Sequence, residues 1–398
     1  MGKAILTLNA GSSSLKFSLF RVSRSGLALI SHGAIEGIGR IPRFTASDIG
    51  GAVLVDQVWD SPRSFEFLLS SLLAWVEDHL APDRLVAVGH RVVYGLARHD
   101  GPERVTPALL DALAELTPLA PLHVPHNLAP IRQIAATHPD LAQIACFDTA
   151  FHHSMPAVAT RFALPDEVTA AGVRRYGFHG LSYEYISRQL QLRAPALAEG
   201  RVIACHLGSG ASLCALKGGR SLDTTMGFTA LDGLVMGTRC GNIDPGVVLY
   251  MMQGMGLDAA AIESILYRRS GLLGASGGLF SDMRDLLASA DPRAAEAIEL
   301  FVYRIVREIG GLVSLLGGLD GIVFTAGIGE RSPDIRARVC AGLGWLGVTL
   351  DPAANDEGRE VVSSDESRVE VMVVPTDEEA MIARHSWQVL EQTEPADA

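Results

Sequence analysis

The sequence lacks several features that would place it in a familiar class at once. Its five cysteines are scattered and form no CxxC pair, so we expect reduced, mainly buried thiols. No uninterrupted apolar run reaches the roughly 18 residues of a membrane span, and no basic-then-apolar signal segment opens the chain. A Walker A loop is also absent. These absences favour a cytoplasmic protein with no membrane partner, which would bind any nucleotide without a Walker A loop.

Charge and composition narrow the class further. The formal net charge is −12, from 33 basic and 45 acidic residues, which argues against a nucleic-acid partner. An anionic ligand would therefore need local positive charge. The 398 residues are 48% hydrophobic and 20% charged, enough for a large core and for two domains of ordinary size. The 41 glycines predict many tight turns or close approaches to a ligand.

The first informative stretch is residues 5–20. A β-type run (5–8) stops at Asn9, a small polar turn follows (10–14), and a second alternating run leaves it. This pattern predicts a hairpin. Gly11 would let backbone N–H groups approach a ligand, and the serines and Lys16 add hydroxyls and a positive charge, so the turn could hold phosphate. The alternative is an ordinary serine-rich turn.

The same strand–turn–strand pattern returns at residues 202–217, which suggests two halves built on related plans, the second beginning near residue 150. Several buried runs end in glycine and polar residues. Because ligands of α/β sheets collect at strand ends, these ends are candidate binding segments. They lie at residues 9–16, 89–91, 148, 206–210 and 327–330.

Hydrophobic periodicity gives the remaining elements. We expect an antiparallel sheet over residues 27–60 and no helix over 118–126, where three prolines interrupt the chain. Residues 326–330 are predicted to form a turn, and Thr376 with Glu379 has the spacing of a capping box. Helices are expected at 62–80, 107–116, 296–316 and from Pro375 to about 390, and strands at 85–88, 144–147, 322–325 and 369–374.

Several local motifs carry little weight. Gly342–Gly347 matches GxGxxG, but no helix follows it, which is the wrong context for a dinucleotide fold. Gly274–Gly278 matches GxSxG without a buried strand before it. His123 and His126 have metal-ligand spacing but no nearby carboxylates. The pair His152–His153 is expected to be partly exposed and without a special role.

Charged residues beside glycine turns are more informative. Arg91 follows a buried run, His179 lies in Tyr176–Gly180, and Arg239 lies in Met236–Gly241. Taken singly, such residues more often form a solvated face or an ion pair. Arginine flanked by glycines, however, suits bidentate capture of carboxylate or phosphate oxygens.

Two longer segments resemble the signatures of the acetate kinases: Asn9-Ala-Gly-Ser-Ser-Ser-Leu-Lys16, and the run from His206 through Asp223-Thr-Thr-Met-Gly-Phe-Thr229 to Asp244-Pro245. Shorter matches follow in the family's order along nearly the whole chain. They are His90-Arg-Val-Val93, Phe147-Asp-Thr-Ala-Phe-His152, Tyr176-Gly-Phe-His-Gly180, Ser281-Asp-Met-Arg284, Phe324-Thr-Ala-Gly-Ile-Gly-Glu330 and Thr376-Asp-Glu-Glu379.

The resemblance implies an α/β fold of two duplicated actin/Hsp70/sugar-kinase-like (ribonuclease H-like) domains around a nucleotide cleft. It places residues 1–149 with 380–398 in an N-terminal domain and 150–379 in a C-terminal nucleotide-binding domain. It implies reversible phosphoryl transfer between ATP and acetate, giving acetyl phosphate and ADP, with Mg²⁺ (or Mn²⁺) as the metal. A homodimer is expected on the same ground.

Site roles follow from the same resemblance, residue by residue. The catalytic group would be Arg91, Asp148, His179 and Arg239. An apolar slot for the acid would combine Val93, Leu122, Phe178 and Ala230, with Arg91. The metal would meet Asn9 and Glu378. Phosphates and nucleotide would meet Ser12, Ser14, Lys16, His206, Leu207, Gly208, Ser209, Gly210, Asp282, Met283, Arg284, Gly327, Ile328, Gly329, Glu330 and Arg331.

The sequence also departs from the family's usual pattern. Ser209 and Asp377 each replace Asn, and Tyr183 replaces His. Ala230 replaces Pro and is smaller, which leaves open a kinase for propionate or another short-chain carboxylate. A third alternative is a nucleotide-switched binding protein of the actin/Hsp70 kind. The paired arginines argue against it, because a pure ATPase switch needs no second anion site.

Overall fold

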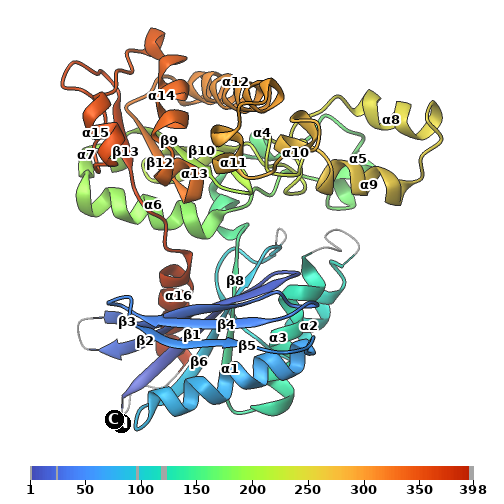
Figure 1. Cartoon of the computed structure of the whole chain (residues 1–398), viewed down its shortest axis with the longest axis vertical. Helices are drawn as coiled ribbons and strands as arrows, with labels where there is room; N and C mark the ends of the chain where they lie inside the picture. Colours follow the sequence, from blue (N-terminus) through green and yellow to red (C-terminus); the bar gives the residue numbers. More distant parts are fainter. Residues whose placement is uncertain (1, 24–25, 96–97, 118–122, 394–398) are drawn as a thin grey trace. The chain divides into compact units, whose positions relative to one another are not determined.

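A computed structural model describes residues 2–23, 26–95, 98–117 and 123–393. The chain divides into two compact units. The first combines Met1–Ala150 with Asp377–Ala398, and the second is Phe151–Thr376 (Figure 1).

The first unit is built on an eight-stranded sheet with the order β5-β4-β3-β2-β1-β6-β8-β7. Strands β1 to β5 pair antiparallel in sequence order, whereas β6 and β8 run parallel to β1. The strands are β1 (Lys3–Ala10), β2 (Ser14–Ser23), β3 (Gly26–Glu36), β4 (Arg43–Asp48), β5 (Val53–Val58), β6 (Arg84–Val92), β7 (Glu103–Arg104) and β8 (Ala142–Phe147).

Helices cover both faces of this sheet (Figure 1). On one face, α1 (Phe65–Leu80) shares a buried core with alternate β1 residues, among them Leu6 and Leu8. On the other face, α16 (Glu378–Thr393) contacts β1, β6 and β8. It comes so close to β6 that a Cβ at Gly89 would collide with Ser386. Because side chains alternate along a strand, Asn9 lies on the α16 face. The remaining helices are α2 (Pro107–Ala114) and α3 (Val124–Thr137).

The second unit has a five-stranded sheet with the order β11-β10-β9-β12-β13. Helix α6 (Gly180–Arg193) packs on one face, where Tyr183 and Ile186 join a core with β9, β10 and β12. The long helix α12 (Pro292–Leu316) contacts β9 and β10, and Gly317 ends it in the left-handed region. The strands are β9 (Arg201–Leu207), β10 (Ala211–Lys217), β11 (Arg220–Thr224), β12 (Gly321–Thr325) and β13 (Glu370–Val373).

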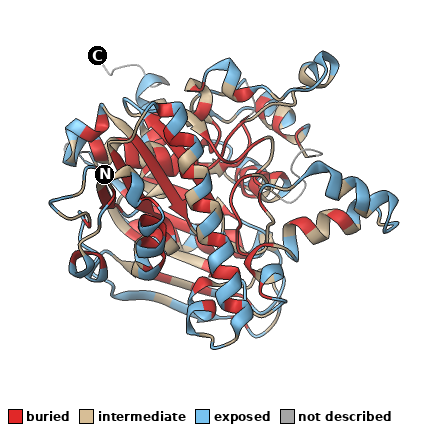
Figure 2. Cartoon of the chain, turned by 90° about the horizontal axis from the view of Figure 1, so that it is seen from above, coloured by how far each residue is buried: buried red, intermediate tan, exposed pale blue. Residues whose placement is uncertain are grey.

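Shorter helices surround this sheet. They are η1 (Ala150–Ser154), α4 (Ala157–Thr160), α5 (Asp166–Ala170), α7 (Pro195–Ala198), α8 (Pro245–Gln253), α9 (Ala259–Arg268), α10 (Gly271–Ala275), α11 (Met283–Ala288), α13 (Ala326–Arg331), α14 (Pro333–Ala341), η2 (Gly344–Leu346) and α15 (Pro352–Glu357). Figure 2 shows that buried residues concentrate on the strands and on the inward faces of the helices. In the described part of the chain, no helix has both the length and the apolar character needed to cross a bilayer.

The two units share a plan. In the first unit, the neighbouring strands β3-β2-β1-β6-β8 comprise an antiparallel trio and two strands parallel to β1. The second unit repeats this arrangement as β11-β10-β9-β12-β13, whereas β4, β5 and β7 are additions to the first sheet. The predicted repetition of a strand–turn–strand unit is therefore confirmed, and so is the mixed α/β class.

Some local predictions are wrong in detail. Helix α3 begins at Val124, inside the stretch expected to be non-helical, because Pro125 falls in its first turn, where a missing N–H breaks no helical bond. Residues 118–122 lie outside the described residues. Residues 326–331 form the short helix α13 instead of a turn. The cap of α16 is Asp377, whose carboxylate accepts from the Ala380 N–H at 2.8 Å, so the Thr376/Glu379 capping box is not formed.

Candidate active site

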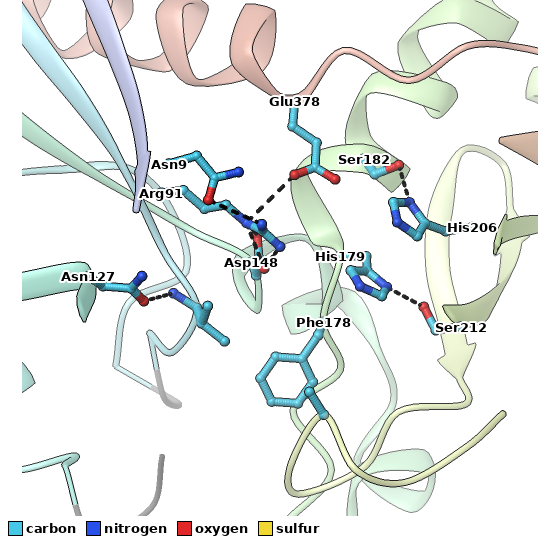
Figure 3. A network of polar contacts seen from close by, with 12 residues as sticks. Asn9, Arg91, Asn127, Asp148, Phe178, His179, Ser182, His206, Ser212 and Glu378 are labelled. Atoms are coloured by element: carbon cyan, nitrogen blue, oxygen red, sulfur yellow. Dashed lines mark hydrogen bonds and ion pairs between the residues drawn. The ribbon is translucent and has the colours of Figure 1, made fainter. Parts of the chain in front are cut away.

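The first group of predicted site residues gathers around Arg91 in the first unit. Figure 3 shows its side chain among Asn9 of β1, Asp148 after β8 and Glu378 at the start of α16. Arg91 Nε and Nη2 donate to Asp148 at 3.0 and 2.7 Å, a side-on bidentate pair. Arg91 Nη1 donates to Asn9 Oδ1 at 3.4 Å, and Nε lies 3.6 Å from Glu378 Oε2. We call these four residues the Arg91 cluster. Asn9, Arg91 and Asp148 lie on or directly after strands that are far apart in sequence. The parallel pairing of β1, β6 and β8 brings these three residues together.

Burial and charge fix the ionisation of Arg91. Burial alone would lower the pKa of the guanidinium, but Asp148 and then Glu378 outweigh it, so the pKa is raised above its ordinary value. Asp148 is 1% exposed, whereas the Arg91 side chain keeps 20% of its surface exposed. Burial, with repulsion from Glu378, raises the pKa of the neighbouring Glu379. Arg91 is thus a permanent cation held rigidly by one carboxylate, with N–H groups left to bind an anion.

Asn127 of α3, a residue that sequence reasoning missed, joins two strand ends beside this cluster. Its Oδ1 accepts from the Val93 N–H at 3.0 Å, and its Nδ2 donates to the Ala10 carbonyl at 3.1 Å. Both bonds are buried, so Asn127 fixes the ends of β1 and β6 relative to each other. The available signal was a polar residue in the apolar pattern of residues 124–134.

The predicted phosphate turn lies at the tip of the β1–β2 hairpin. The Gly11 N–H donates to the Ser14 carbonyl at 2.9 Å, which closes the turn. Ser12 is exposed, and Lys16 of β2 lies opposite Asn9 of β1 in the strand register. Residues directly opposite each other point to the same face, so Lys16 lies on the face that carries the Arg91 cluster.

In the second unit, His179 and His206 stack with ring centroids 4.1 Å apart and an interplanar angle of 18°. Each ring is tied to a serine: His179 Nδ1 lies 2.8 Å from Ser212 Oγ, and His206 Nδ1 lies 2.8 Å from Ser182 Oγ (Figure 3). We call this pair the histidine stack. His179 occupies the left-handed region, with φ 58°, directly before α6.

Gly210 lies where Arg239 and His179 converge. A Cβ at this residue would lie 2.6 Å from Arg239 Nη2 and 3.3 Å from His179 Nε2. Arg239 Nη1 also donates to the Ala230 carbonyl at 2.7 Å. The turn between β9 and β10 therefore carries, beside its glycines, a cation and an imidazole edge, a combination suited to an anionic ligand.

His152 is buried, so the prediction of a partly exposed residue without a special role is wrong. It is 1% exposed, and both ring nitrogens are bonded: Nδ1 lies 2.8 Å from Ser221 Oγ and Nε2 lies 2.9 Å from the Phe178 carbonyl. Burial lowers the pKa of His152 to about 4. A neutral His152 thus holds the backbone directly before His179. Two adjacent histidines in the sequence gave no signal of this burial.

A pocket of about 360 Å³ opens beside the same turn. All three predicted nucleotide segments contribute to it, through residues 208–209, residues 282–284, and residues 327–328 with Arg331. Arg284 closes one part of the wall through an ion pair with Asp282 at 2.7 Å. The other lining residues are Leu272, Ser281, Leu287 and Ser332.

Other predicted nucleotide residues lie beside this pocket without lining it: His206, Leu207, Gly210, Gly329 and Glu330. Glu330 has a different local task. Its Oε1 accepts from the N–H groups of Ala326 at 2.7 Å and Thr376 at 3.1 Å, which ties the start of α13 to the segment after β13. Ala326 has φ 63°, a conformation that a non-glycine residue adopts only with support.

The predicted acid slot is divided between the units. Val93 is buried at the end of β6 in the first unit, and Phe178 and Ala230 are buried in the second. Leu122 lies outside the described residues.

The predicted metal ligands form an oxygen donor set, the amide of Asn9 and the carboxylate of Glu378. Hard cations such as Mg²⁺ prefer oxygen ligands, and Mg²⁺ is usually held by one or two carboxylates together with water and substrate phosphates. Among the described residues, no group of three or more His, Cys, Asp and Glu side chains could hold a metal ion. The residues present fit an open site of this kind rather than a closed protein cage.

Comparison with known proteins gives a consistent result. The Acetokinase family profile matches residues 4–384. The acetate kinase of Rhodopseudomonas palustris strain TIE-1 is 53% identical over 394 residues, covering 98% of this chain and 99% of the relative. The chain also resembles the crystal structure of Porphyromonas gingivalis acetate kinase, with TM-score 0.86, 36% identity and coverage of 98% and 100%. For a propionate kinase from Francisella tularensis, the TM-score is 0.90, with 34% identity and coverage of 97% and 100%.

Proposed function

The chain belongs to the acetokinase family, and we propose that it catalyses the reversible transfer of a phosphoryl group from ATP to acetate, giving acetyl phosphate and ADP. It is then a phosphotransferase with a carboxyl group as acceptor. The observation that carries the proposal most directly is the convergence of Arg239 and the Nε2 edge of His179 on Gly210, beside a pocket lined by the predicted nucleotide segments.

The chemistry requires no general base. A carboxylic acid with a pKa of about 4, as for Asp and Glu, is already ionised at pH 7. The barrier lies in bringing two anions together and in spreading charge over the transferring group, so positioning and electrostatic stabilisation do most of the work. Arginine, histidine and a divalent cation are suited to both tasks.

In the first unit, Arg91 binds the acetate carboxylate or the transferring phosphoryl group. Asp148 holds the guanidinium side-on at 2.7–3.0 Å, so Arg91 meets the anion without first losing side-chain freedom. Val93, with Leu122 beyond the described residues, provides apolar surface for the methyl group.

In the second unit, Arg239 binds the transferring phosphoryl group from its anchor on the Ala230 carbonyl. His179 donates a hydrogen bond to the equatorial oxygens as their charge develops. Phe178 and Ala230 supply the second part of the apolar slot. Gly208, Ser209 and Gly210 allow the backbone to approach the phosphates closely.

Asn9 and Glu378 would hold Mg²⁺, with Mn²⁺ as an alternative. When bound, the metal neutralises charge on the phosphates of the nucleotide. Ser12, Ser14 and Lys16 of the hairpin turn bind the terminal phosphate by hydroxyl groups and a positive charge. The pocket lined by residues 208–209, 282–284, 327–328 and Arg331 takes the rest of ATP or ADP.

The remaining assignments follow from family membership. We assign residues 1–149 with 380–398 to an N-terminal domain and residues 150–379 to a C-terminal nucleotide-binding domain. The protein is proposed to act in the cytoplasm as a homodimer.

A hydroxamate assay tests the function. The protein is incubated with ATP, Mg²⁺, acetate and hydroxylamine, which traps acetyl phosphate. We expect product only when all of ATP, metal and acetate are present. ATP hydrolysis without hydroxamate would instead favour a nucleotide-switched binding protein.

A second candidate substrate is propionate. Ala230 is smaller than the proline usual at this place, and the F. tularensis structure similar to this chain is that of a propionate kinase. One methylene changes discrimination by only about 1–3 kcal/mol. Comparing kcat/KM for acetate, propionate and butyrate decides between them: an undiminished preference for acetate rejects the propionate reading.

A further inference from the structure

Two buried hydroxyl groups extend from the histidine stack into the core of the second unit. The Tyr183 hydroxyl lies 2.5 Å from Ser212 Oγ, and Ser212 Oγ lies 2.8 Å from His179 Nδ1. Tyr183 comes from the first turn of α6 and Ser212 from β10. Both residues are 0% exposed, so neither hydroxyl exchanges its partner for water. The three groups form a continuous chain of hydrogen bonds that ends on His179.

Tyr183 determines the direction in which these hydrogen bonds are donated. Burial raises the pKa of its hydroxyl well above the ordinary value, so Tyr183 keeps its proton. Among the described residues, Ser212 Oγ is the side-chain oxygen within hydrogen-bond distance of this buried hydroxyl, and a proton that Tyr183 keeps is satisfied there. The Tyr183 proton is therefore directed to Ser212 Oγ.

Ser212 accepts one of these hydrogen bonds and donates the next. A hydroxyl has one proton to donate. With its oxygen accepting from Tyr183, the Ser212 proton points to His179 Nδ1. A neutral imidazole carries one proton, and if Nδ1 accepts, Nε2 must carry it. The Nε2 edge is the one that lies 3.3 Å from a Cβ position at Gly210, on the side of the β9–β10 turn.

We propose that Tyr183 and Ser212 are positioning residues that hold His179 as the Nε2–H tautomer, ready to donate to an anionic oxygen at the β9–β10 turn. The inference rests on the proposed role of His179 in phosphoryl transfer. Acetate kinases usually carry His in place of Tyr183, so the hydroxyl relay belongs to this chain's own sequence. Holding an imidazole in one tautomer through its second nitrogen is also how the aspartate of a serine-protease triad acts.

The surroundings of His179 support a ring held in one orientation. Its φ of 58° is unfavourable for a residue with a side chain, so the fold must stabilise it. On the other side of the ring, His206 is fixed in turn: Thr376 Oγ1 donates to Ser182 Oγ at 2.8 Å, and Ser182 Oγ lies 2.8 Å from His206 Nδ1. A serine thus holds Nδ1 of each ring in the stack.

The direct test is the tautomer itself. A long-range ¹H–¹⁵N spectrum of ¹⁵N-histidine-labelled protein distinguishes the two neutral tautomers, and the spectrum of H179Q identifies the His179 signals. We expect the Nε2–H form in the unchanged protein. Tyr183→Phe keeps the ring in the core and removes only the hydroxyl, so we expect a mixture of tautomers there. In the hydroxamate assay, its kcat should fall about tenfold, the effect of one lost buried hydrogen bond, with KM for acetate and ATP unchanged.

The remaining variants separate positioning from general damage. Ser212→Ala should lower kcat at least as much as Y183F, and the double variant should be no worse than S212A, because the two hydroxyls act as one chain. Ser187→Ala is the matched control: Ser187 is a buried residue of α6, and its hydroxyl donates a partly buried hydrogen bond to the Gly219 carbonyl at 2.8 Å, away from His179. Its tautomer and kcat should not change.

The unchanged protein alone can overturn the inference. An Nδ1–H tautomer at His179 in the unchanged protein contradicts the relay. A His179 spectrum in Y183F or S212A that is identical to that of the unchanged protein contradicts it as well. Failure of the proposed function is a separate result: no hydroxamate from the unchanged protein would reject the activity, whereas the spectrum would still decide the tautomer.

Discussion

Gly210→Ala is the most specific perturbation of the second unit. The added Cβ would lie 2.6 Å from Arg239 Nη2. Non-bonded heavy atoms normally stay about 3.5 Å apart, so the guanidinium must move by about 1 Å. Arg239 cannot move freely, because its Nη1 is held 2.7 Å from the Ala230 carbonyl. The same Cβ would lie only 3.3 Å from His179 Nε2, which is closer than an ordinary van der Waals contact.

The expected consequence is a loss of turnover with the fold intact. A displacement of about 1 Å in a group that positions the reaction can lower the rate about 10²-fold. Gly210 does not have a positive φ, so alanine is compatible with the backbone. Such a Gly→Ala change alters stability by about 1 kcal/mol or less, which shifts Tm by only about 2–4 °C in a domain of this size.

The assay is a pair of measurements on G210A: initial rates of hydroxamate formation and a thermal unfolding curve. Gly310→Ala is the control, because a Cβ at this residue of α12 meets no atom within 4 Å, and it should retain full activity. Unchanged kcat in G210A would refute the reasoning that Arg239 and His179 act at this turn.

Three further predictions concern other parts of the molecule. Asn127→Ala leaves the Ala10 carbonyl and the Val93 N–H buried without this partner, so urea denaturation should show a loss of about 2 kcal/mol of unfolding free energy; a loss below about 0.5 kcal/mol would contradict it. The pKa of His152 is about 4 in the folded protein and about 6.5 when unfolded. Its contribution to stability is therefore full above pH 6.5 and is lost as pH falls toward 4. Between pH 7 and pH 5 this amounts to about 2 kcal/mol, and H152Q should lose that much less than the unchanged protein over this interval; equal losses would contradict it. Arg43→Ala breaks an exposed bidentate pair with Asp56. Because solvent screens an exposed pair, stability should change little and activity not at all; a clear loss of turnover would show that the assay responds to any lost arginine.

The sequence indicated the two-part plan because each half begins with a local pattern, a strand, a small-residue turn and a returning strand. What it could not show was the pairing of β1 with β6 and of β9 with β12, since these strands are distant in sequence and either edge of a hairpin could accept a parallel partner. Predicted strand ends were also too early: Asn9 and Arg91 lie within β1 and β6.

The errors at the site have physical causes. Residues 326–331 carry two glycines and read as a turn, yet the Glu330 carboxylate accepts from the Ala326 N–H and stabilises a helical turn. His152 gave no periodic signal, and its burial depends on partners from β11 and from the chain before α6. Residues that act through a second residue, such as Asn127 and Ser212, are hard to find because their importance lies in distant backbone and side-chain groups.

The central claim is that Arg91 and Arg239 carry the transfer of a phosphoryl group to acetate. The most direct measurement compares kcat for hydroxamate formation from ATP, Mg²⁺ and acetate in the unchanged protein, R91A and R239A, with R43A as control. Losing one preorganised donor typically lowers kcat about 10²–10³-fold, and we predict that loss for each of the two variants and none for R43A. Near-normal turnover in R91A or R239A, or no hydroxamate from the unchanged protein, would contradict the account.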